Sequence, residues 1–247
     1  MTAVPGSFGA NEEQALLNIY PYFGRIKQIV EPMKSRELSV LDIGCGPGMG
    51  DLRLLKHMGL ATLVGADIKD VAPDAKGLGI EYIKSDIECN LPVADARFDV
   101  VLMDNVIEHM YEPRKVLTEC LRVLKKGGSF IGLTPNQARL TNRLRLLMGR
   151  SVYYPLEYWL GNNRESHVDK GGVQVFAGHV REYTMAELVR MLQVVGFENV
   201  TTYLDAAATP SIRDARSRIR GAMFAYNLAE RIFPGAGYMI TVHARKP

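Results

Sequence analysis

The sequence predicts an α/β fold with a doubly wound, mostly parallel sheet. An apolar run at 38–43 ends in a glycine-rich loop and is followed by a helix-like stretch at 51–58. Further short apolar runs alternate with helical segments, and alternating strands and helices are typical of a parallel sheet. Each of the first four runs ends close to an acidic residue. The five predicted strands of this alternation are 38–43, 61–66, 80–83, 98–103 and 129–133.

Helical segments flank these strands. Apolar residues recur at helical spacing over 11–33, interrupted at Pro21, which predicts an N-terminal helical flank. The segment 113–124 has the spacing of an amphipathic helix, and Gly127-Gly128 is expected to close it.

The alternation is lost between Pro135 and Gly178, so we interpret this stretch as an insertion that caps the core. Thr184 and Glu187 then form a capping-box pair that starts a helix, and Gly196 ends it. A strand at 197–203, a long helix at 212–233 and a strand at 238–244 complete the chain. The predicted organisation is a flank at 1–37, a ligand-binding core at 38–135, a cap at 136–178 and the rest of the core at 179–247.

The composition is that of a globular protein: 47% of the 247 residues are apolar and 23% are charged. A net charge of +3 does not indicate nucleic-acid binding. The three cysteines show no paired spacing, and neither a targeting segment nor a membrane span is evident, so a reduced, cytoplasmic protein is expected. The five histidines and three cysteines form no ligand-spaced cluster, which predicts that no metal is bound.

The glycine-rich loop carries the strongest functional signal. Residues 40–48 read VLDIGCGPG, and glycines between a strand and a helix N-terminus let a ligand approach backbone N–H groups. The spacing is G-x-G-x-G, which does not complete the G-x-G-x-x-G dinucleotide fingerprint. Asp67 after the second strand could accept hydrogen bonds from ribose hydroxyls, and Asp86 with Ile87 after the third could hold an adenine. An adenosine-containing ligand is therefore expected.

These residues, together with DVVLMDNVIEHM at 99–110 and VLKKGGSFIGLTPN at 123–136, resemble the class I S-adenosylmethionine-dependent methyltransferases. The resemblance resumes at GHVREYT (178–184), which looks like the small-molecule branch of that family. It implies a seven-stranded, Rossmann-like sheet whose last strand runs antiparallel, with S-adenosylmethionine as cofactor and S-adenosylhomocysteine as product. The cofactor-binding residues that it implies are Asp42, Gly44, Cys45, Gly46, Gly48, Asp67, Ile68, Asp86, Ile87, Asp104 and Asn105.

If the acceptor is a hydroxyl, its proton must leave, and an imidazole titrates near neutrality. His109 and His179 are therefore the candidate bases, although a structural role for the Glu108-His109 pair remains an alternative. In the cap, arginines alternate with leucines over 139–150, which indicates either an amphipathic helix with a solvated basic face or an anion-binding lid. The candidate acceptor contacts are Arg143, Tyr154, Trp159, Arg181 and Tyr183.

The leading interpretation is O-methylation of a small molecule or glycan precursor, because the cap resembles those of methyltransferases in polysaccharide biosynthesis. The alternatives are C- or O-methylation of a quinone-like or lipid acceptor, a nicotinamide oxidoreductase, and a non-catalytic cofactor-binding protein. The basic helix predicted at 212–233 could also contact an anionic membrane surface, with core packing of its apolar side preferred. The sequence does not indicate the oligomeric state.

Overall fold

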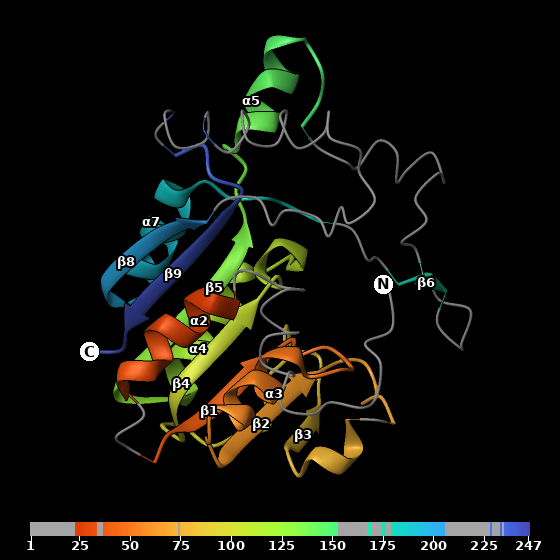
Figure 1. Ribbon diagram of the computed structural model, residues 1–247, viewed down its shortest axis with the longest axis vertical. Helices are drawn as coiled ribbons and strands as arrows, with labels where there is room; N and C mark the ends of the chain where they lie inside the picture. Colours follow the sequence, from red (N-terminus) through yellow and green to blue (C-terminus); the bar gives the residue numbers. More distant parts are fainter. Residues whose placement is uncertain are drawn as a thin grey trace.

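A seven-stranded mixed sheet forms the centre of the computed structural model (Figure 1), with the strand order β3-β2-β1-β4-β5-β9-β8. Neighbouring strands from β3 to β5 pair in parallel, whereas β9 is antiparallel to both β5 and β8. This confirms the predicted doubly wound sheet with an antiparallel last strand. The strands are β1 (Ser39–Ile43), β2 (Thr62–Asp67), β3 (Glu81–Lys84), β4 (Phe98–Asp104), β5 (Leu124–Pro135), β8 (Glu198–Asp205) and β9 (Met239–Arg245). The structure describes residues 23–33, 37–73, 75–152, 167–168, 174–175, 179–205, 228, 233 and 235–247.

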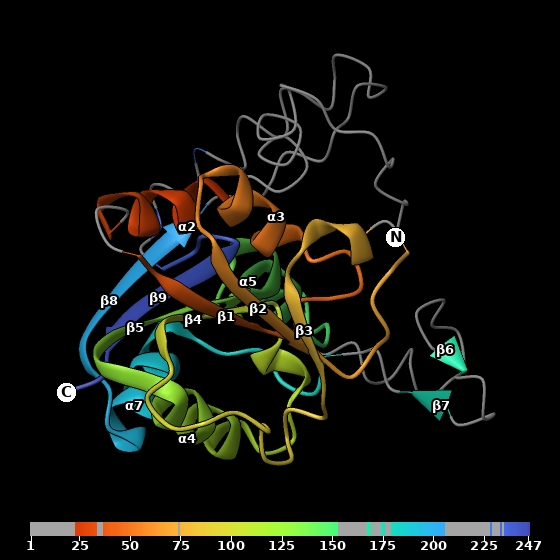
Figure 2. The same cartoon turned by 90° about the horizontal axis from the view of Figure 1, so that it is seen from below.

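Helices cover both faces of the sheet (Figure 2). On one face, α2 (Phe23–Val30) and α3 (Gly50–His57) pack on buried strand residues such as Val100. On the other face, α4 (Pro113–Val123) and α7 (Met185–Val195) pack on residues such as Val101. Successive strand residues point to opposite faces, so the near-continuous apolar run of β4 supplies both cores.

The second half of the core begins as the sequence predicts. The Thr184 side chain accepts from the Glu187 N–H, and the Glu187 carboxylate accepts from the Thr184 N–H, which completes a capping box. Gly196 ends α7 with a φ of 113°, a conformation that glycine adopts readily.

The expectation that Gly127-Gly128 closes α4 is wrong. The helix ends at Val123, and Leu124 is already extended, with φ −70° and ψ 140°. Leu124 is fully buried and pairs with Phe98, so strand pairing takes over directly from the helix. Gly127, with a φ of 72°, instead turns the chain within β5, where the register against β4 shifts.

The first part of the predicted cap, residues 136–152, is described, and it corrects one interpretation. The helix α5 (Leu140–Leu147) lies beyond the carboxyl ends of the strands (Figure 1). The side expected to be basic and solvated includes Arg139, which is only 4% exposed. The side expected to be apolar and covered includes Leu147, which is 82% exposed. Arg139 points inward because it pairs with a buried carboxylate, described below.

Other parts of the predicted organisation fall largely outside the described residues. They include 11–22 of the N-terminal flank, most of 153–178 and all of the predicted helix 212–233 except 228 and 233. Within the cap, β6 (His167–Val168) and β7 (Gln174–Val175) pair antiparallel. Among the described helices, none combines the length and the apolar content needed to cross a bilayer.

Candidate functional site

The glycine-rich loop joins β1 to α3 at the carboxyl edge of the sheet, the edge where open α/β sheets bind ligands. Gly44 has a φ of 73°, and a Cβ there would lie 2.3 Å from Val106 Cγ2. Its N–H donates to the Ala66 carbonyl at 2.7 Å, which ties the loop to the end of β2. Among the described residues, no atom beyond the chain neighbours lies within 4 Å of where a Cβ on Gly46 or Gly48 would stand, so this stretch of backbone has space beside it.

Asp67 lies against this loop, and its role in holding a ribose stays a prediction. Its Oδ2 accepts from the Gly46 N–H at 2.9 Å and its Oδ1 from the Lys69 N–H at 2.8 Å. A carboxylate has about four acceptor positions, so both oxygens can accept further bonds. The neighbouring Ile68 is 57% exposed beside it.

Asp86 and Ile87 follow β3 with opposite exposure. Asp86 is exposed, and its Oδ1 accepts from the Glu88 N–H at 3.0 Å, a local turn contact. Ile87 is buried in the core that also holds β4. The adenine-binding role of this pair stays a prediction.

Three carboxyl groups are crowded beneath the loop. Asp42, at the end of β1, is 1% exposed, and Asp51, in the first turn of α3, is 5% exposed. Within the described residues, Asp42 Oδ2 and Asp51 Oδ1 have no hydrogen-bond partner. Burial, followed by the negative charge of Asp104, raises the pKa of both groups well above its ordinary value. Buried acceptors left without donors indicate a place for a cationic or donor-rich ligand.

Asp104 and Asn105 complete this part of the site at the end of β4. Burial, followed by the charge of Glu108, raises the pKa of Asp104 to about 7. Asn105 has a φ of 53° and donates from Nδ2 to Asp104 Oδ1 at 2.8 Å. Cys45 is buried within the loop. Asp51 was not predicted as a site residue, because an acidic residue in the first turn of a helix is usual for local reasons.

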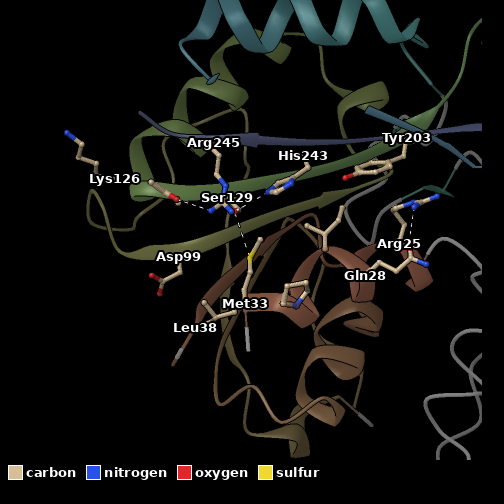
Figure 3. A pocket seen from close by; sticks show the side chains of 14 residues that line it. Arg25, Gln28, Met33, Leu38, Asp99, Lys126, Ser129, Tyr203, His243 and Arg245 are labelled. Atoms are coloured by element: carbon tan, nitrogen blue, oxygen red, sulfur yellow. Dashed lines mark hydrogen bonds between the residues drawn. The ribbon is translucent and has the colours of Figure 1, made fainter. Parts of the chain in front are cut away.

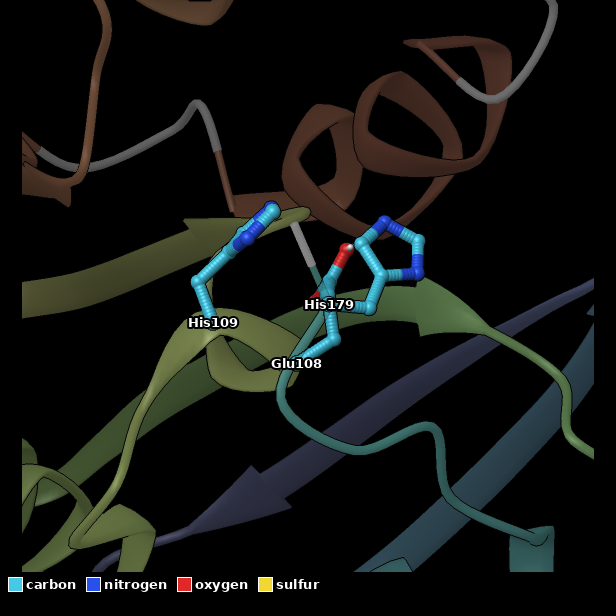
Figure 4. A group of neighbouring side chains, drawn as sticks. All are labelled: Glu108, His109 and His179. Carbon is cyan, nitrogen blue, oxygen red and sulfur yellow. Dashed lines mark ion pairs between the residues drawn. The ribbon is translucent and has the colours of Figure 1, made fainter. Parts of the chain in front are cut away.

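A second group brings together the two predicted bases (Figure 4). His109 ends the short helix η3 (Ile107–His109), and His179 lies on the segment that leads to α7; their ring centroids are 5.0 Å apart. Glu108 is fully buried, and its Oε2 accepts from Thr134 Oγ1 at 2.9 Å. Its Oε1 has no partner within hydrogen-bond distance among the described residues and lies 4.0 Å from His179 Nε2.

Buried charges position His179. Its Nδ1 lies 3.2 Å from Glu182 Oε1, and Glu182 accepts from Arg139 at 2.6 Å and from Asn142 at 3.2 Å. Burial lowers the pKa of His179, but the hydrogen bond to Glu182 and the charge of Glu108 outweigh burial and raise it. Burial alone raises the pKa of Glu182, whereas the bonds from His179 and Arg139 lower it overall. The two residues that anchor this arrangement, Glu182 and Arg139, were not predicted as site residues.

The fold brings together three possible metal ligands that are not close in the sequence. The ligand atoms of Glu108, His109 and His179 all lie within 4.8 Å of one another, a grouping that could hold a metal ion. The expectation of no metal rested on spacing along the chain, which does not connect residues 109 and 179.

The predicted acceptor contacts are dispersed. Arg143 is half-buried and donates to the Ala138 carbonyl at 2.7 Å. Arg181 pairs with Glu187 at 2.5 Å and lies over the ring of Tyr183, which is itself buried in the core. Tyr154 and Trp159 lie outside the described residues.

A cavity of about 530 Å³ lies between α2 and the strands β5, β8 and β9 (Figure 3). Arg25 and Met33 line it on one side, and Ser129, Tyr203 and His243 line it on the other. Its described lining includes no residue of the glycine-rich loop, so this cavity is separate from the glycine-loop site.

Comparisons with known proteins identify a methyltransferase domain that includes the glycine-rich loop. Residues 41–132 match the family model described as a methyltransferase domain. A probable S-adenosylmethionine-dependent methyltransferase of Mycolicibacterium smegmatis is 31% identical over 163 residues, which cover 64% of this chain and 51% of that protein. A ubiquinone biosynthesis O-methyltransferase of Cereibacter sphaeroides is 35% identical over 118 residues, covering 45% of this chain and 47% of that one.

Among solved structures, a methyltransferase from Archaeoglobus fulgidus described as dependent on the same cofactor aligns with a TM-score of 0.57 at 18% identity. The alignment covers 94% of this chain and 98% of that structure. The chain spans about half the length of the curated relatives that it matches.

Proposed function

Since the chain belongs to the class I S-adenosylmethionine-dependent methyltransferases, we propose that it transfers a methyl group from this cofactor to a hydroxyl oxygen of a small acceptor. The observation that carries the hydroxyl assignment is the group of Glu108, His109 and His179. Glu108 and His109 follow the strand that ends in Asp104, and His179 joins them from the segment before α7. An acceptor atom that has no proton to lose would not require such a group.

The residues around the glycine loop fit the cofactor. Asp42 and Asp51 are buried, and each has one carboxyl oxygen without a hydrogen-bond partner among the described residues. Together with the half-buried Asp104, they present acceptors to which the ammonium group of an amino acid could donate. Asp67 keeps acceptor capacity for ribose hydroxyls, and the backbone around Gly46 has space beside it among the described residues. When bound, the cofactor supplies a methyl group on a sulfonium, whose thioether product leaves as the acceptor oxygen takes the methyl.

The histidine group handles the hydroxyl proton. An acceptor oxygen must lose that proton as its bond to carbon forms, and a positioned imidazole within hydrogen-bond reach can take it. Glu182 holds His179 Nδ1, so Nε2 is directed toward Glu108 and away from the bond to Glu182. The buried pair of Arg139 and Glu182 fixes this orientation of the ring. Less conformational entropy is then lost when the imidazole and the acceptor reach the reacting geometry.

Two acceptor classes follow from different observations. The half-buried Arg143 in the cap and the exposed Arg181 just after it favour a polar acceptor such as a saccharide or glycan precursor. The relatives named as ubiquinone biosynthesis O-methyltransferases favour a phenolic, quinone-like acceptor instead. The saccharide class stays our first proposal, together with a reducing, cytoplasmic setting, which three free cysteines support.

The test pairs cofactor binding with turnover on acceptors of both classes. We expect wild-type protein to methylate a hydroxyl-bearing acceptor, and Asp67→Ala to weaken cofactor affinity at least tenfold. His179→Gln should leave that affinity within about twofold and lower turnover at least a hundredfold. Turnover on amine, thiol or carbon acceptors alone would contradict the hydroxyl assignment.

A further inference from the structure

We propose that Glu108, His109 and His179 bind a divalent cation that receives the acceptor hydroxyl. The proposal rests on the proposed function for the acceptor alone; the binding of the ion is argued from the side chains themselves. The three ligand-type side chains converge at the carboxyl end of β4, with their ligand atoms within 4.8 Å of one another (Figure 4).

The buried oxygen of Glu108 points to a ligand independently of this convergence. Glu108 is 0% exposed, Thr134 satisfies only its Oε2, and Oε1 has no hydrogen-bond partner among the described residues. A buried carboxylate oxygen without a partner is costly, so native proteins pair such atoms with a donor or a metal. The atom that faces Oε1 is His179 Nε2, at 4.0 Å.

In the neutral tautomer of His179 that donates from Nδ1 to Glu182, a cation fits between His179 and Glu108. A neutral imidazole that donates from Nδ1 to Glu182 carries its lone pair on Nε2, so two acceptors then face each other. Their separation of 4.0 Å is too long for a hydrogen bond. Two ligands at about 2.1 Å from one ion lie roughly 3.0 to 3.4 Å apart, so binding would draw the two groups together by about 0.6 to 1.0 Å.

The hydrogen bonds around His179 are of the kind that orient metal-bound histidines. A ligating histidine usually donates its other ring N–H to a carboxylate, which fixes the ring and raises its basicity. Glu182 takes that position for His179, and Arg139 and Asn142 hold Glu182 in turn. Two imidazoles and one carboxylate suit Zn²⁺, Mn²⁺ or Fe²⁺, and three protein ligands leave coordination positions open for a substrate oxygen.

An ion here changes how the hydroxyl proton leaves. As a Lewis acid it lowers the pKa of the bound hydroxyl, whose proton passes to solvent water, and the oxygen pair then forms the bond to the methyl carbon. The carbon–sulfur bond breaks with its electron pair remaining on sulfur. Without an ion, an imidazole would accept the proton directly.

The test is calorimetric titration of the full chain, dialysed against chelator, with ZnCl₂ and with MnCl₂ in separate runs. We expect one site per chain with a Kd in the micromolar range or tighter for at least one ion. Glu108→Gln and His179→Gln should each weaken that site at least tenfold. His57→Gln, which removes an exposed histidine on α3, is the matched control and should leave the site unchanged. Co²⁺ absorption adds a spectroscopic readout of histidine ligation.

Each result has one meaning. A site with the same affinity in wild type and both ligand variants, or no saturable site below 1 mM, would overturn the proposal. If circular dichroism shows that Glu108→Gln does not fold, the titration is repeated with His109→Gln, because His109 is only half-buried. Cation binding without methyl transfer to any hydroxyl acceptor would contradict the proposed function but not the cation site. Full methyl transfer in excess chelator would contradict the role of the ion but not the proposed function.

Discussion

Replacing Asp104 by Asn should make the ligand-free protein less sensitive to pH. Burial, followed by the charge of Glu108, raises the pKa of Asp104 from its ordinary 3.8 to about 7. In the unfolded chain this carboxyl titrates near 3.9. Between about pH 4 and pH 7 the unfolded chain therefore releases a proton that the folded protein keeps. The contribution of Asp104 to the free energy of unfolding thus falls as the pH rises through this window.

The magnitude follows from the size of the shift. A difference of about 3 units, at about 1.36 kcal/mol per unit, sets a ceiling of about 4 kcal/mol. Asp104 keeps some contact with solvent and bonds to Asn105, so we expect about half of that ceiling, roughly 2 kcal/mol. Asp42, Asp51 and Glu108 also have raised pKa values, so the variant should reduce the pH dependence without abolishing it.

The assay is urea unfolding of cofactor-free protein at pH 5, 6, 7 and 8. Relative to wild type, Asp104→Asn should gain stability from pH 5 to pH 8. Asp70→Asn, which changes an exposed surface carboxylate paired with Lys84, is the control and should run parallel to wild type. If the Asp104→Asn curve also runs parallel to wild type, the carboxyl crowding beneath the glycine loop does not store the free energy inferred here.

Three further predictions concern the loop, the buried ion pair and the cation. In urea unfolding, Gly44→Ala should lower the free energy of unfolding by about 3 kcal/mol, because the new Cβ would meet Val106. Gly46→Ala should cost only about 1 kcal/mol, because its Cβ meets no described atom and only the positive φ is strained. Equal losses in the two variants would contradict this. Glu182→Gln should cost about 3 kcal/mol because it leaves the buried Arg139 without its counter-charge, and an effect below 1 kcal/mol would count against it. Dialysis against a chelator should lower methyl transfer at least tenfold with recovery on adding the ion, and unchanged turnover would refute the requirement.

The features of the site that are local in sequence were predictable. The alternation of strands and helices around the loop, the capping box at Thr184 and the position of Asp67 at the end of the second strand each depend on residue types within a few positions. Periodicity and glycine spacing carry this information directly.

Long-range electrostatics were not predictable. His109 and His179 meet only because the segment after the cap returns across η3, where Val180 and Arg181 donate to the Glu108 carbonyl. Likewise, Arg139 looked like part of a solvated face, and its burial follows from Glu182, which lies 43 positions later. Asp51 was missed for a different reason: a helix-start aspartate and a ligand-facing one look alike in sequence.

The most direct test of the central claim is calorimetric titration of the purified chain with S-adenosylmethionine, S-adenosylhomocysteine and NAD in separate runs. Our account predicts that the first two bind at one site, that Asp67→Ala weakens both, and that NAD gives no heat of binding. Binding of NAD alone, or wild-type affinity for S-adenosylmethionine in Asp67→Ala, would contradict the assignment of the glycine-loop site.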